Sequence, residues 1–106
     1  MARRINIDGG TGKVKADDRA FTISKNNQAG VHHDVEWKVD GGTATYTVNF
    51  TAGSPFANPS PFSMPPNGTH NPGSLASTGV NLNSAYKYEI RTGNTVTDDP
   101  FVIIED

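Results

Sequence analysis

The sequence contains no cysteine, which excludes disulfides, thiolate catalysis, cysteine-ligated zinc and iron–sulfur clusters. It has only 2 Leu and 3 Glu, two of the better helix-forming residues, and this scarcity disfavours a helical fold. No apolar run approaches the ~20 residues of a membrane span, and the opening "MARRINIDGG" lacks the apolar stretch of a signal peptide. We therefore expect a cytoplasmic protein or a mature exported form.

The abundant residues favour strands and turns. The chain has 11 Thr, which suit a pleated strand, and 10 Asn and 11 Gly, which suit turns. A length of 106 residues is that of a single domain, residues 1–106. The net charge of -2 provides no general attraction to nucleic acid or to anionic membranes. These numbers predict one all-β domain without a nucleic-acid or membrane partner.

Two stretches alternate between apolar and polar residues, "VEWKVD" at 35–40 and "TATYTVNFT" at 43–51. Such a period of two predicts half-buried strands. The "DGG" at 40–42 joins the two stretches and predicts a hairpin turn between them. The residues expected to face the core are Val35, Trp37, Val39, Ala44, Tyr46, Val48 and Phe50.

Further short strands are predicted on both sides of this pair, at "RINI", "KVKA", "AFTIS", "YKYEI" and "FVIIE". The last of these is apolar on both faces, so we expect it in the interior of a sheet. About seven short strands separated by turn residues are typical of a β-sandwich.

Residues 53–79 form a loop rich in Pro, Gly and Asn, with six of the seven prolines of the chain. Proline removes a backbone donor, so this loop cannot be a central strand. Phe56, Phe62 and Met64 lie in it. Either they are buried, and the loop caps the sandwich, or they are the contact residues for a partner; a long loop in a compact domain is often functional.

At this point the chain resembles the cupredoxin family. "DVEWKVDGGTATYTVNF" is similar to the cupredoxin strands that run D-x-V-x-W/F, a turn and an alternating strand, and "YKYEI…DPFVIIED" is similar to their closing strand pair. The resemblance covers about the second two-thirds of the chain and implies a Greek-key β-sandwich. An immunoglobulin-like sandwich is the alternative.

The copper ligands of the family are missing from the matching positions. The stretch Thr43–Tyr46 has no histidine, Ile90 or Arg91 stands where the family has its cysteine, and "TGNTVTDD" has neither histidine nor methionine. A blue-copper site needs a thiolate and two imidazoles. The resemblance therefore implies the fold without electron transfer. We expect no cofactor and no catalysis, but an interaction or structural module with an unknown protein partner or with a second copy.

A metal-binding protein that uses His32 or His33 with His70 is the alternative function. If the alternation of residues 35–39 extends backward, the two adjacent histidines point to opposite faces of a strand and cannot share an ion. No metal-binding spacing links either of them to His70. The acidic pairs at 17–18 and 98–99 are predicted to be solvated turn residues rather than an acid–base pair.

Overall fold

The computed structural model describes residues 3–24, 35–56, 61–72 and 80–105, and within these ranges the chain is mostly β-strand with no α-helix. In the part so described, no helix has the length and apolar character needed to cross a membrane. The strands are β1 (Arg3–Asp8), β2 (Lys13–Val14), β3 (Ala20–Ser24), β4 (Val35–Asp40), β5 (Tyr46–Phe50), β6 (Phe62–Met64), β7 (Thr69–His70), β8 (Ser84–Thr92), β9 (Thr95–Asp98) and β10 (Phe101–Glu105), and a short 3-10 helix, η1 (Ala16–Asp18), lies between β2 and β3.

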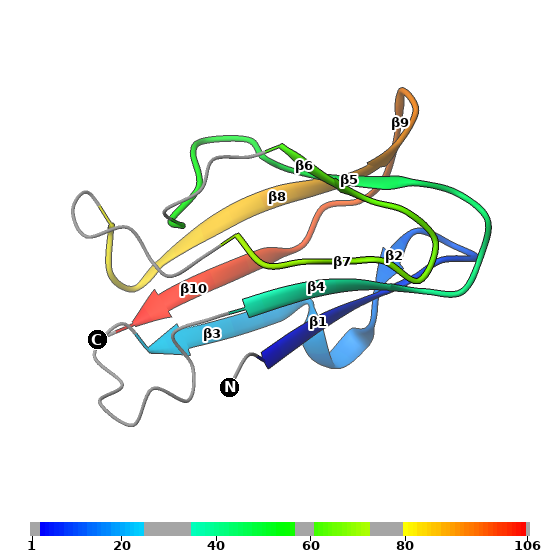
Figure 1. Cartoon of the computed structure of the whole chain (residues 1–106). Coiled ribbons are helices and arrows are strands. Elements are labelled where there is room, and N and C mark those ends of the chain that lie inside the picture. Colours follow the sequence, from blue (N-terminus) through cyan, green and yellow to red (C-terminus); the bar gives the residue numbers. More distant parts are fainter. Residues whose placement is uncertain (1–2, 25–34, 57–60, 73–79, 106) are drawn as a thin grey trace.

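These strands form two mixed sheets (Figure 1). The four-stranded sheet has the order β2-β1-β4-β7. The six-stranded sheet has the order β3-β10-β8-β5-β6, with β9 paired to β8. Each sheet contains one parallel pair, β1 with β4 and β3 with β10, while the other pairs are antiparallel. The all-β prediction is therefore confirmed.

The core lies between the two sheets and follows the predicted alternation. In β4 and β5 every second residue is buried, and Trp37 is fully buried. The indole of Trp37 meets Phe50 of β5 and Tyr88 of β8, both from the other sheet, at ring-centroid distances of 6.1 Å and 5.5 Å. The side chain of Trp37 thus joins the two layers, and its predicted inward orientation is confirmed.

The predicted hairpin between β4 and β5 is wrong. β4 pairs with β1 and β7, whereas β5 pairs with β6 and β8 in the other sheet. Residues 41–45 therefore carry the chain from one layer to the other. The alternation shows which face of each strand is buried, but two inward faces can meet across the core as well as side by side.

The closing strands agree with the sequence. β10 lies between β3 and β8, so its predicted interior position is confirmed. Its inward residues Val102 and Ile104 are fully buried. Its outward residues Phe101 and Ile103 are half-buried, so this strand is apolar on both faces.

The described part of the proline-rich loop contributes two short strands at the sheet edges. β6 is the last strand of the six-stranded sheet and β7 the last of the four-stranded sheet. A turn at Pro65–Gly68 connects them, closed by a hydrogen bond of 2.8 Å from the Gly68 N–H to the Pro65 carbonyl. An edge position suits short strands within a proline-rich loop, because only one side of each strand must pair. We call residues 61–71 the crossover segment.

Candidate functional site

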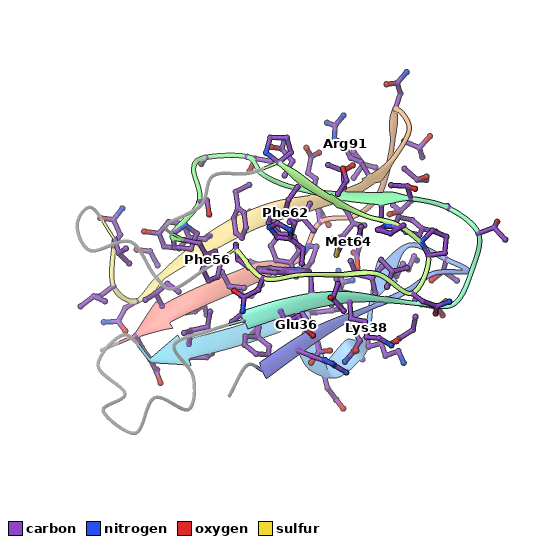
Figure 2. The ribbon with its side chains drawn as sticks, viewed as in Figure 1. Glu36, Lys38, Phe56, Phe62, Met64 and Arg91 are labelled. Carbon is purple, nitrogen blue, oxygen red and sulfur yellow. The ribbon has the colours of Figure 1, made fainter. Side chains whose placement is uncertain are left out.

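The three apolar residues proposed as partner contacts lie in the core. Phe56, Phe62 and Met64 expose only 4%, 8% and 0% of their surface. The two phenyl rings pack edge-on against Trp37, at centroid distances of 5.7 Å and 5.4 Å. Figure 2 shows all three between the sheets, while Glu36 and Lys38 lie on the opposite side of β4. Their role as a surface for a partner is not supported, because the hydrophobic effect has drawn them inward.

The burial of Phe62 and Met64 leaves a different set of residues exposed. Along the crossover segment, residues alternate strictly, so that even-numbered positions are buried or half-buried and odd-numbered positions are exposed. None of the exposed side chains is charged. They are Pro61, Ser63, Pro65, Asn67, Thr69 and Asn71.

The outward faces of the two sheets differ from this row because they carry ion pairs. On the four-stranded sheet Arg4 pairs with Glu36 at 2.8 Å and Lys38 with Asp40 at 3.0 Å. On the six-stranded sheet Arg91 pairs with Glu89 at 3.0 Å. Such surface pairs add little to stability, but they keep a face hydrated. The crossover segment therefore forms an uncharged strip between two charged faces.

The residues proposed for metal binding are only partly described. His32 and His33 lie outside the described residues. His70 is half-buried on β7, and its ring stacks on Phe62 at 4.1 Å with an interplanar angle of 17°. Within residues 3–24, 35–56, 61–72 and 80–105, no group of three or more His, Asp or Glu is placed to hold an ion. The metal-binding alternative stays a prediction.

Three residues lie in the stretches that the sequence resemblance compares with the copper ligands of cupredoxins, namely Tyr46, Ile90 and Arg91. Ile90 is fully buried. Tyr46 is also buried, and its hydroxyl donates a 2.9 Å hydrogen bond to the carbonyl of Gly9. Arg91 turns outward to Glu89. These side chains therefore contribute to the core, to a hydrogen bond and to an ion pair.

Next to the hydrogen bond between Tyr46 and Gly9, three glycines bring two turns into close contact. We call Gly9, Gly41 and Gly42 the glycine corner. The Gly9 N–H donates to the carbonyl of Asp40 at 2.9 Å. A methyl group on Gly9 would lie 2.0 Å from the carbonyl oxygen of Gly41, and one on Gly42 would lie 2.2 Å from that of Gly9. Only glycine permits backbones to approach this closely.

The crossover segment is fixed to this corner. The Oδ1 of Asn67 accepts a 2.9 Å hydrogen bond from the Gly41 N–H. The carbonyl of Gly68 accepts a 3.0 Å bond from the Val39 N–H. Asn67 also has a positive φ of 59°, which Asn tolerates better than most residues. The exposed strip is thus held at its turn by backbone as well as side-chain bonds.

Asp98 is the one buried charged residue in the described part of the chain. Its carboxylate accepts hydrogen bonds from the Arg19 guanidinium, from the Val14 N–H at 2.8 Å and from the Asp99 N–H at 2.9 Å. These contacts join β9 of one sheet to β2 of the other. The prediction that both Asp98 and Asp99 are solvated is therefore wrong for Asp98, because donors distant in sequence surround it, while Asp99 is exposed.

The pKa of Asp98 lies below its ordinary value. Burial alone raises the pKa, but the hydrogen bonds from Arg19 and from the N–H groups of Val14 and Asp99 favour the charged form and outweigh burial. Each of these donors is hydrogen-bonded to the carboxylate of Asp98. The arrangement suits a structural tie between the sheets better than a group that exchanges protons.

We expect Asp98→Asn to lower the free energy of unfolding by about 1.5 kcal/mol at neutral pH, since a charge-assisted hydrogen bond becomes neutral. A lowered folded-state pKa stabilises the protein above about pH 4 and loses this effect as pH falls through the folded pKa. The difference between wild type and variant should therefore shrink in acid. Thermal unfolding across a pH series measures it.

Asp99→Asn is the matched control for this prediction. Asp99 is exposed, and its 3.6 Å contact with Lys87 joins two largely solvated side chains. Its replacement should change stability by less than about 0.5 kcal/mol. Equal effects of the two variants, or a pH-independent effect of Asp98→Asn, would show that Asp98 is not the tie.

Comparison with known proteins found no matching family model, no matching curated protein and no matching solved structure.

Proposed function

We propose that the chain is a non-catalytic interaction module with a cupredoxin-like fold, and that its contact surface is the crossover segment. One feature supports the fold. The closing strands on which the resemblance rests, β8 and β10, are antiparallel neighbours. We propose no electron transfer, because Thr43–Tyr46 has no histidine and Ile90 or Arg91 stands where the family has its cysteine.

The exposed row of the crossover segment is the observation that carries the proposal. The centres of protein interfaces are depleted of charged residues, and this row is uncharged while its two flanking faces carry ion pairs. Binding also costs less when a surface is ordered beforehand. The buried side chains of Phe62 and Met64 hold the segment against the core, and the hydrogen bond between Asn67 and Gly41 holds its turn.

Site-specific photo-crosslinking in the source cells tests the proposal. A photoreactive residue at Ser63 or Thr69 should give a discrete adduct, and the same residue at Thr95, an exposed threonine of β9, should not. The double variant Ser63→Lys/Thr69→Lys places charge in the strip and should abolish the adduct formed from Asn71. An adduct with twice the mass of the chain would identify a second copy as the partner.

Adducts that form equally well from Thr95, or that survive both lysines, would overturn the crossover segment as the contact surface. Circular dichroism of each variant is the control for folding. Both lysine positions are exposed, so the strand content should not change.

A further inference from the structure

The turn of the crossover segment contains the only Asn-Gly pair in the sequence, Asn67–Gly68. Asn67 is exposed and stands at the third position of the turn that Pro65 begins and Gly68 closes. Pro66 stands at the second position. Proline there, followed by a positive φ of 59° at Asn67, is the arrangement of a type II turn.

An asparagine followed by glycine can modify itself, because glycine has no side chain to hinder the approach of its nitrogen. The backbone nitrogen of Gly68 attacks Cγ of Asn67 and loses its proton. The side-chain nitrogen of Asn67 leaves as ammonia, and a five-membered cyclic imide remains. Water then opens the ring at one of its two carbonyls and gives aspartate or isoaspartate. The sequence of steps changes no oxidation state and consumes only water.

The fold holds both reacting groups of this pair. The Gly68 N–H, which contains the nucleophile, donates to the carbonyl of Pro65 at 2.8 Å. The carboxamide of Asn67, which contains the electrophile, accepts from the Gly41 N–H at 2.9 Å. Reaction therefore requires the turn to open, and it should be slower in the folded protein than in the unfolded chain.

The isoaspartate product differs from asparagine in the main chain itself, which it lengthens by one methylene group. The next atoms along the chain have little room for this change. The Gly68 carbonyl accepts from the Val39 N–H at 3.0 Å, and a group added at the Gly68 α-carbon would come within 2.5 Å of Pro65. β7 follows directly and has only two residues paired with β4.

We propose that isoaspartate formation at Asn67 is a slow, one-way modification that detaches β7 from β4 and so opens the edge of the four-stranded sheet. The chemistry of this turn does not depend on the function proposed for the crossover segment.

The first test measures the rate of the reaction. Purified protein is incubated in mildly alkaline buffer with and without urea, and peptide mapping follows the conversion of Asn67. Folded protein should react about tenfold or more slowly than unfolded protein, since hydrogen bonds must open first. Pro66→Gly loosens the turn and should speed the folded reaction, whereas Pro61→Gly, outside the turn, should not. Equal rates in folded and unfolded protein would overturn the proposed restraint.

The second test measures the structural effect. Chromatography separates the isoaspartate form, and hydrogen exchange then reports on the amides of Val39 and Gly41, which bond to Gly68 and Asn67. Both should lose protection in the isoaspartate form. Asn67→Asp introduces the same charge without the methylene group and should keep both amides protected. Protected amides in the isoaspartate form would overturn the detachment of β7.

Discussion

Replacement of Trp37 by alanine is expected to lower the free energy of unfolding by about 3–5 kcal/mol, the usual cost of removing a large buried aromatic side chain. Trp37 is fully buried and meets four other rings edge-on, at centroid distances between 5.4 Å and 6.1 Å. These rings come from the six-stranded sheet and from the proline-rich loop, whereas Trp37 itself lies on β4 of the four-stranded sheet. A small domain has only about 5–15 kcal/mol in total, so the variant should be largely unfolded at physiological temperature.

Trp37→Phe is the matched control. It keeps an aromatic ring between the sheets and removes the indole Nε1, an atom that has no hydrogen-bond partner among the described residues. Deletion of an unsatisfied buried donor recovers part of the lost packing energy. Urea denaturation should therefore rank the proteins as wild type, Trp37→Phe and Trp37→Ala. If Trp37→Ala unfolds at nearly the wild-type midpoint, the two layers do not depend on this residue.

Gly9→Ala is expected to have the second largest effect, about 3 kcal/mol, at the upper end of the cost of overpacking. The added methyl group would lie 2.0 Å from the carbonyl oxygen of Gly41 and 2.9 Å from that of Asp40. Both obstacles are backbone atoms, which cannot rotate away. The two turns of the glycine corner would have to separate, and the hydrogen bonds that Gly9 makes with Asp40 and Tyr46 would weaken.

Gly10→Ala, one residue further along, provides the comparison. The nearest atom to its added methyl group is the side-chain Oδ1 of Asp8 at 3.3 Å, which can move. We expect a change of less than about 0.5 kcal/mol. Thermal unfolding of the two variants side by side decides the matter. Similar losses for both would mean that any added side chain harms this turn and that the close approach of Gly9 to Gly41 is unimportant.

The local pattern of the sequence predicts the strands well but not their neighbours. Alternation around Trp37 and Tyr46 identifies two strands and their buried faces, because the side-chain period follows from strand geometry alone. It does not determine the sheet to which each strand belongs. A turn with glycines at 41 and 42 fits a hairpin as well as a crossing between layers.

The burial of Asp98 and the exposed row of the crossover segment are harder to predict for a related reason. Asp98 receives its donors from Arg19 and Val14, about eighty residues earlier, so no local signal marks it as buried. The alternation of the crossover segment was already present in the sequence. The prolines obscure it, because they argue against a central strand, and the large apolar side chains of Phe62 and Met64 give a stronger signal than the small polar residues between them.

The parallel pairing of β3 with β10 has a consequence for how the chain folds. β3 pairs with β10, so that residue 20 lies opposite residue 101. During synthesis β3 therefore cannot pair with β10 until nearly all of the described chain has left the ribosome. Pairings between such distant residues slow folding, because the chain loses the entropy of closing a long loop before the stabilising contacts form. A nascent chain stalled before residue 100 would leave β3 without β10, and its exposed edge would be open to wrong partners.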